Sequence, residues 1–363
     1  MWLEIIYKRL IKILLFLFVI VYFTLSNTYE EEFKNLSLAF AGDLFLQKHL
    51  SNSYYDPSSK KYYFPPDIFE EIEEYIRKDF SSIVIDTPIA SNIFQVSGYP
   101  LFNAPVEILD LLKKSGFNIM ILSTNHIFDK GEIGLTATIE NIKKRGLYYV
   151  GAYTSEEDSK NFLVLSKNGI KVGILAYTFS INGFSLPKNK EYMVNLINED
   201  KIKEDIRKIK NLVDFTIIYL HWGYIEYSEK LESYQKSLAK KIISWGGDLI
   251  VGSHPHSVRP YEKINGKWCF YSLGNFFTDQ YGLNIPQVKF GLILNITLNK
   301  YKNKTFIIRK EIIPIFISKT TKDKNNPHRY KVIKAEKITN LTYVESDSKI
   351  YLKKVLNYIS KGE

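Results

Sequence analysis

The stretch GGDLIVGSHPH, residues 246–256, shows the pattern that decides the fold. Two glycines end a helical segment, an apolar run follows as a buried strand, and two histidines stand directly behind that strand. Other apolar runs end in the same way: LAFAGD at Asp43, IVID at Asp86, NIMILSTNH at Asn125 and His126, and FTIIYLH at His221. The chain therefore repeats one theme, a buried strand followed by a side chain fit for chemistry.

Helical stretches separate these strands. Residues 105–115, 134–145 and 234–245 carry apolar side chains at helical spacing, and each lies between two strand candidates. Such alternation predicts an α/β layered fold. Because ligands bind beyond the carboxyl ends of parallel strands, we expect the strand-end side chains to meet at one rim.

The strand-end side chains combine imidazole, amide and carboxylate, a mixture that suits Mn, Zn or Fe. Four of the six histidines stand in these motifs, and only His49 and His328 fall elsewhere. His254 and His256, two residues apart in a segment expected to be extended, would face the same side. Each motif alone has a plainer interpretation, such as a turn, a helix cap or a satisfied core histidine. Together they predict a metal site.

The N-terminal segment predicts a membrane anchor. Lys8, Arg9 and Lys12 precede the apolar run of residues 13–25, and Glu30 to Glu32 follow it. Positive charge before the run places the N-terminus inside and the bulk of the chain outside the cell. The uncharged run is short for a full span, although the Lys12 side chain can extend to the interface. A cleaved signal peptide is the main alternative, and a buried core helix is a second.

Charge and cysteine content exclude other classes. The net charge is +10, but Lys and Arg are spread along the chain rather than gathered in one motif, which argues against nucleic-acid binding. The single cysteine, Cys269, lies in an apolar run and cannot form an internal disulfide. The sequence contains no P-loop of the form G-x-x-x-x-G-K-[ST].

The runs GDLFL, STNHIFDKG, HWGYIEY, GGDLIVGSHPH and YSLGNFF, spread over about residues 36–300, make the chain similar to the CapA, or poly-γ-glutamate capsule-synthesis, family. The resemblance implies the four-layer α/β/β/α sandwich of the calcineurin-like metallophosphatases, here preceded by one N-terminal transmembrane helix. It also implies one or two divalent metal ions. The metal ligands that it implies are Asp43, Asp86, Asn125, His221, His254 and His256.

The resemblance assigns His126 to the substrate or leaving group. Asp129 would orient that imidazole or serve as a replacement ligand, and we count both residues as catalytic candidates. Glu226 is a second replacement ligand, expected with Asn275 at the substrate rim. Two departures bear on metal content: Asp86 stands where the family usually has Glu, and Phe45 stands where metallophosphatases have a histidine.

We expect three regions: an anchor and tether (1–34), a metallophosphatase-fold domain (35–300) and a C-terminal β extension with a helix (301–363). The resemblance implies a cell-surface factor in the synthesis, transport or anchoring of an anionic capsule polymer, with ligation carried out by capsule-synthase partner subunits. The alternatives are a metal-dependent phosphoesterase acting on a phosphoester substrate and a non-catalytic module that binds polymer. Whether the chain is an enzyme stays open at this point.

Overall fold

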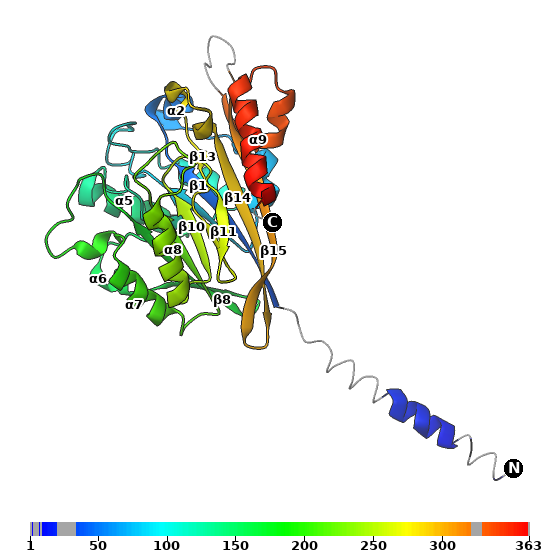
Figure 1. Ribbon diagram of the computed structural model, residues 1–363. Helices are drawn as coiled ribbons and strands as arrows, with labels where there is room; N and C mark the ends of the chain where they lie inside the picture. Colours follow the sequence, from blue (N-terminus) through cyan, green and yellow to red (C-terminus); the bar gives the residue numbers. More distant parts are fainter. Residues whose placement is uncertain (1, 3–6, 8, 20–33, 321–328, 362–363) are drawn as a thin grey trace.

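Two β-sheets packed face to face form the centre of the molecule (Figure 1). The computed structural model describes residues 2, 7, 9–19, 34–320 and 329–361. The first sheet has the order β16-β15-β14-β1-β4-β5-β6, with β13 beside the end of β1. Its strands are β1 (Lys34–Leu44), β4 (Phe80–Ile85), β5 (Ile119–Ile121), β6 (Tyr148–Val150), β13 (Asn275–Phe277), β14 (Phe290–Tyr301), β15 (Lys304–Thr320) and β16 (Arg329–Lys334).

The second sheet has the order β11-β12-β10-β9-β8-β7. Its strands are β7 (Leu163–Lys167), β8 (Ile170–Thr178), β9 (Phe215–His221), β10 (Leu249–Ser253), β11 (Tyr261–Ile264) and β12 (Lys267–Phe270). A separate small hairpin joins β2 (Tyr55–Asp56) to β3 (Lys61–Tyr62). The strands that carry the predicted site residues, β1, β4 and β5 in one sheet and β9 and β10 in the other, are parallel within each sheet.

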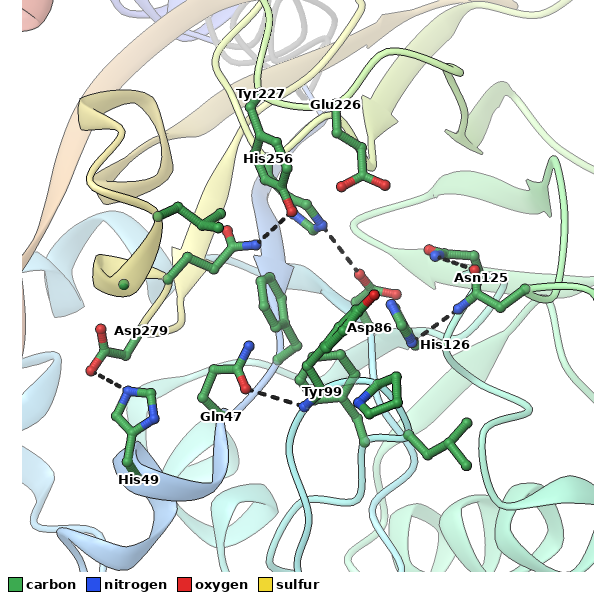
Figure 2. Close-up of a pocket in the computed structure, with 18 of the residues that line it drawn as sticks. Gln47, His49, Asp86, Tyr99, Asn125, His126, Glu226, Tyr227, His256 and Asp279 are labelled. Carbon is green, nitrogen blue, oxygen red and sulfur yellow. Dashed lines mark hydrogen bonds and ion pairs between the residues drawn. The ribbon is translucent and has the colours of Figure 1, made fainter.

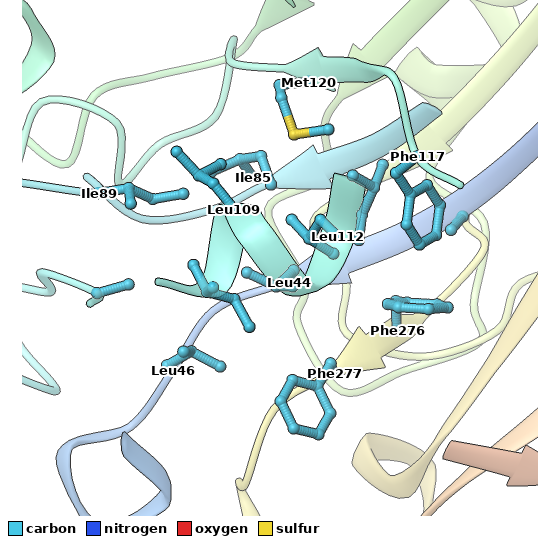
Figure 3. Packing of buried hydrophobic residues seen from close by; sticks show 14 of the residues in the cluster. Leu44, Leu46, Ile85, Ile89, Leu109, Leu112, Phe117, Met120, Phe276 and Phe277 are labelled. Atoms are coloured by element: carbon cyan, nitrogen blue, oxygen red, sulfur yellow. The ribbon is translucent and has the colours of Figure 1, made fainter. Parts of the chain in front are cut away.

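Helices cover both outer faces of the sheet pair. The helices are α2 (Lys48–Asn52), α3 (Glu73–Ile76), α4 (Ile108–Ser115), α5 (Gly131–Lys144), α6 (Glu156–Lys160), α7 (Glu199–Ile209), α8 (Ser233–Trp245) and α9 (Ser346–Lys361). Leu109 and Leu112 of α4 pack on Leu44, Ile85 and Met120 of the first sheet (Figure 3). Helices α7 and α8 cover the second sheet with buried side chains of their own. The layers are therefore α/β/β/α, as expected for a mixed α/β chain.

The space between the sheets is filled by apolar side chains from both. Phe40 and Val84 of the first sheet share one buried cluster with Ile174, Phe215 and Val251 of the second. Strand β1 is buried over most of its length, as expected for a central strand covered on both faces. This packing fixes the relative position of the two sets of strand ends, which come from different sheets.

Two glycines let backbones approach closely beside the site. A Cβ atom on Gly42 would lie 1.9 Å from the carbonyl oxygen of Gly274, and one on Gly252 would lie 2.1 Å from that of Tyr271. The close approach at Gly42 allows the Asp43 amide to donate a hydrogen bond of 3.0 Å to Gly274. Glycine at these positions thus brings Asp43 and the residues after β10 into place.

The region beyond residue 300 continues the first sheet. We expected a separate β extension there, but β15 pairs with β14 from Tyr301 and Lys304 to Phe290 and Phe316. The C-terminal helix α9 closes the inter-sheet core at this side, with Leu352 and Val355 buried. A boundary at residue 300 therefore falls inside a β-hairpin.

The predicted membrane span of residues 13–25 lies partly outside the described residues. Residues 9–19 are helical with exposed side chains. No helix in the described part of the chain is long and apolar enough to cross a membrane. The acidic tether and the Lys/Asn-rich loop near residue 325 fall largely on residues that the structure does not describe.

Candidate functional site

Six predicted side chains meet at the carboxyl ends of the strands. Asp43 comes from β1, Asp86 follows β4, Asn125 follows β5, His221 ends β9, and His254 and His256 follow β10. All six residues are at most 4% exposed. The predicted convergence on one rim is therefore correct, although the rim joins the edges of two sheets rather than one.

His221 is central to this cluster. Its Nε2 atom lies 2.6 Å from Oδ1 of Asn125 and 3.6 Å from Oδ1 of Asp86. Its Nδ1 atom lies 2.9 Å from the Ser253 hydroxyl and 3.8 Å from Oδ1 of Asp43. One imidazole thus contacts groups from both sheets.

The two carboxylates lack partners for much of their hydrogen-bonding capacity. Asp43 Oδ2 accepts a 3.1 Å hydrogen bond from the His254 amide, but Asp43 Oδ1 and both oxygens of Asp86 have no hydrogen-bond partner. The Nδ1 atom of His254 is likewise buried without a partner. Buried polar atoms normally find partners, because leaving them unsatisfied costs free energy. These unsatisfied atoms indicate that the cluster binds a ligand or an ion.

The His254-Pro255-His256 segment is not extended, which corrects the expectation that alternation would put both rings on one side. His254 and His256 have φ values of 94° and 52°, a region that non-glycine residues rarely occupy. Their ring centroids still lie 5.9 Å apart. Left-handed backbone at adjacent site residues is strain of the kind that concentrates at functional sites.

Burial and neighbouring charges shift the pKa values of the ionisable groups in different directions. Burial and the nearby imidazoles hold the pKa values of His221 and His254 well below the usual value, so both rings are neutral. Burial also lowers the pKa of His256, but Asp43 and Asp86 raise it to about 9. Burial, together with the charge of Asp43, raises the pKa of Asp86 to about 6. The neutral rings of His221 and His254 are in the form that ligates metals, whereas a metal at His256 would have to displace a proton.

His126 stands beside the cluster with Asp129. Its Nδ1 atom lies 2.8 Å from Oδ2 of Asp129 and 3.0 Å from the Asn182 amide nitrogen. The Phe102 amide donates to the same Asp129 oxygen at 2.8 Å. Burial lowers the pKa of His126, but Asp129 and Asp86 outweigh it and raise that pKa. Of the two roles expected for Asp129, this contact favours the orientation of His126 over that of a replacement ligand.

The cluster opens into a pocket of about 930 Å³ (Figure 2). Asp86, Asn125, His126 and His256 line its inner part, together with Glu226. The Glu226 carboxylate lies 3.9 Å from His254 Nε2, so its predicted place at the rim agrees with the structure. No lysine or arginine is found among the pocket-lining residues that the structure describes.

Asn275, the other predicted rim residue, does not line the pocket. It is fully buried, and its Oδ1 atom lies 3.0 Å from Nδ1 of His256. The expectation was wrong because β13 pairs with β1 at Asp43, which carries Asn275 behind the imidazole. Asn275 therefore supports His256 instead of meeting a ligand.

Phe45, which the resemblance sets against a histidine of the metallophosphatases, packs beside the cluster. Its ring centroid lies 4.8 Å from that of His256 and 5.5 Å from that of Phe102. The ring is 2% exposed and forms part of the pocket wall. An apolar wall therefore stands where a further nitrogen donor would be expected.

Sequence reasoning missed the far side of the pocket, where His49 and Asp279 meet. His49 Nε2 lies 2.6 Å from Oδ2 of Asp279, which is buried and also contacts Lys319 at 3.0 Å. Gln47 and Tyr99 lie between this pair and Asp86 in Figure 2. The sequence offered one indication, because His49 closely follows the Asp43 motif. Its partner Asp279 is 230 residues away, so the sequence could not predict their contact.

Among the described residues, no group of three or more His, Cys, Asp or Glu side chains is placed so that it could hold a metal ion as it stands. The nitrogen-to-oxygen distances between the histidines and the two aspartates are 3.4–3.9 Å. The side chains thus surround a common point, but they would have to move closer to coordinate one ion.

Comparisons with known proteins identify the family to which the chain is similar. Residues 37–280 match the family described as "Bacterial capsule synthesis protein PGA_cap". The chain is 28% identical over 260 residues to "Capsule biosynthesis protein CapA" of Bacillus anthracis, covering 69% of this chain and 62% of that protein. It is 30% identical over 259 residues to "PGA biosynthesis protein CapA" of Bacillus subtilis (strain 168), covering 70% and 66%. The matched part is therefore less than two thirds of either relative.

Among solved structures, the calcineurin-like phosphoesterase YfkN from Bacillus subtilis aligns with 78% of this chain and 90% of its own, at a TM-score of 0.44 and 17% identity. This structural similarity is too low to support a functional assignment. The match to the family covers more than half of the chain and includes every residue of the cluster. The chain belongs to the bacterial capsule synthesis protein PGA_cap family.

Proposed function

We propose that this chain is a CapA-type accessory factor that binds an anionic capsule polymer of the poly-γ-glutamate type at a metal-dependent site. The names of the two relatives supply the polymer and the pathway. The observation that carries the proposal is the buried cluster of Asp43, Asp86 and His221, which opens into a pocket large enough for several residues of a polymer.

The donor types and the unsatisfied oxygens of the cluster are those that one or two divalent metal ions would take, although the side chains would have to move onto the ion. Asp43, Asp86, Asn125, His221, His254 and His256 would hold them. A cation would satisfy the carboxylate oxygens that have no partner, and it would offset the repulsion between the two aspartates. The mixed nitrogen and oxygen donors suit Mn, Zn or Fe. When bound, the metal would supply Lewis-acid polarisation of a ligand oxygen.

The other pocket residues would orient and shape the ligand. Asp129 fixes the ring of His126 through Nδ1, which leaves Nε2 for the pocket. Glu226 lies across the opening, and the Phe45 and Phe102 rings form an apolar wall. Because lysine and arginine are missing from the described lining, metal ions and imidazoles would have to meet the negative charge of the polymer.

A metal-dependent phosphoesterase is the second candidate, favoured by the His126–Asp129 pair. An imidazole held by a carboxylate and facing the pocket is suited to give a proton to a leaving oxygen. His126 would then be the general acid, and Asp129 its positioning residue. The two candidates share the site and differ in whether a bond is broken there.

The proposed location is the cell surface, with the apolar run of residues 13–25 as a single-pass anchor. The support is the charge pattern around that run. Because the sequence has no P-loop, polymer ligation would belong to partner subunits of a capsule synthase. This chain would act on the polymer outside the membrane.

Complementation tests the proposed function. A bacterium that needs this chain for its capsule should regain surface polymer with the wild-type gene but not with Asp43→Asn or His254→Ala. Both variant proteins must be present at the wild-type expression level and must give the wild-type circular dichroism spectrum. Full recovery of polymer by both variants would contradict a role for the site in capsule formation.

A further inference from the structure

The hairpin formed by β14 and β15 extends beyond the rest of the first sheet, at the end where β1 begins (Figure 1). Tyr301 pairs with Lys304 at its tip, and Lys302 has a φ value of 55° in the turn. Lys34, the first residue of β1, pairs with Lys300 of the same hairpin. The chain therefore enters the domain beside this tip.

The tip carries exposed apolar side chains between lysines. Tyr301 is 41% exposed, Phe306 45% and Ile308 52%. Lys304 and Phe306 share one face of β15, since they are two residues apart in a strand. Scattered single apolar residues are ordinary on a surface, but three on one projecting hairpin form an apolar edge.

The lysines at the tip have no carboxylate partner in the described part of the chain. Within residues 34–320 and 329–361, Lys302 and Lys304 form no ion pair, and neither does Lys34. Lys300, one step further into the sheet, differs because its Nζ atom lies 2.8 Å from Asp214. The Lys302 ammonium lies 5.1 Å from the centre of the Tyr301 ring. Uncompensated charge is thus concentrated at the projecting end.

We propose that this hairpin tip docks onto an anionic lipid bilayer. The inference rests on the membrane anchor of the proposed function. Lysines flanking tyrosine and phenylalanine form the combination that suits a membrane interface, with the rings among the headgroups and the ammonium groups near anionic lipid. Only residues 26–33 separate the proposed anchor, residues 13–25, from Lys34, so the anchor would hold the tip close to the bilayer.

Docking would set the height of the site above the membrane. Strand β1 runs from Lys34 at the tip to Asp43 in the cluster, which is about 30 Å at ~3.3 Å per residue. The pocket would then open at the end of the domain away from the lipid. A polymer leaving the membrane could reach it without the domain tilting towards the bilayer.

A fluorescent label at the tip tests the inference in the full-length chain. Cys269 is fully buried, so a thiol reagent should modify only an introduced cysteine. Asn303→Cys places an environment-sensitive dye at the exposed turn, and Ser185→Cys places it beside the pocket-lining Phe184 as a control. The labelled chains are reconstituted into phosphatidylcholine vesicles with or without about one-third phosphatidylglycerol.

The dye at position 303 should shift to the blue in anionic vesicles only, and the dye at position 185 should not shift in either. Lys302→Glu with Lys304→Glu should abolish the shift, as should high salt. The matched control, Lys236→Glu with Lys240→Glu on exposed positions of α8, changes net charge equally and should leave the shift intact. Phe306→Ser with Ile308→Ser should reduce it.

Flotation of the same samples separates this inference from the anchor. A chain that floats with both kinds of vesicle, but whose dye at position 303 emits alike in both, retains the anchor and overturns hairpin docking. A chain that floats with neither kind overturns both. An equal loss of the shift in the α8 control would also overturn docking, because net charge alone would then explain the effect.

Discussion

The Nδ1 atom of His126 lies 2.8 Å from Oδ2 of Asp129, and this pair stands at the edge of the buried Asp/His cluster. The carboxylate is held in turn by the Phe102 amide. The imidazole is therefore fixed in orientation without belonging to the group of proposed metal ligands. This separation allows binding and proton transfer to be tested independently.

We expect His126→Ala to keep its metal and lose turnover. If the site hydrolyses phosphodiesters, removal of a general acid should lower the rate by about 10²–10⁴-fold. His221→Ala should instead lose metal and activity together, because its ring contacts Asn125 and lies near both aspartates. Initial rates and metal content are measured on the same preparations. A wild-type chain that is inactive with Mn, Zn and Fe would exclude the phosphoesterase candidate.

Asn275→Ala should weaken metal affinity without removing a proposed ligand. The Asn275 side chain accepts a hydrogen bond from Nδ1 of His256, so its loss frees that ring to rotate. Loss of such an orienting partner typically lowers affinity by about 10–100-fold. Competition with a metal-binding dye measures the change. An affinity equal to that of wild type would mean that His256 is not a ligand.

Asp79 should contribute to stability in a pH-dependent way. Partial burial opposes ionisation, but hydrogen bonds from Lys167 and Ser37 lower the pKa of Asp79 below its usual 3.8. Its contribution is therefore complete above the unfolded-state pKa and is lost as the pH falls through the lower folded value. Asp79→Asn should reduce the free energy of unfolding at pH 7 by about 1 kcal/mol. Urea unfolding should show that this difference shrinks below pH 4; an unchanged difference would contradict the assignment.

The N-terminal segment should remain on the mature chain. The basic residues before the apolar run and the missing cleavage signature favour an uncleaved anchor. Membrane fractionation followed by N-terminal sequencing of the membrane-bound protein decides the matter. A mature protein that begins after Leu25 would refute the anchor and support a signal peptide.

The convergence of the cluster could be predicted because it depends on a local rule. An apolar run that ends in Asp43 or Asp86 needs only parallel strands for its last side chain to reach one edge of the first sheet. His221 stands at the edge of the second sheet, and the packing of the two sheets brings these edges together. The alternation of these runs with helices predicted an α/β layered fold, whereas the four-layer order was implied by the family resemblance.

The rest of the site depends on contacts that no local pattern records. His49 reaches Asp279 only because β13 lies beside β1, and the same pairing buries Asn275 behind His256. The left-handed conformations of His254 and His256, in the loop after β10, are rare for residues other than glycine and are not marked by residue type. An expectation based on sequence periodicity treats this segment as extended, so it could not predict these backbone conformations.

Metal content of the purified full-length chain tests the central claim most directly. After loading with Mn, Zn or Fe and removal of excess metal, elemental analysis should find one or two ions per wild-type chain, as the donor set predicts. His254→Ala should bind far less, because the proposed site loses a ligand, whereas His49→Ala, at the far side of the pocket, should match wild type. A folded wild-type chain that retains none of the three metals would contradict the account.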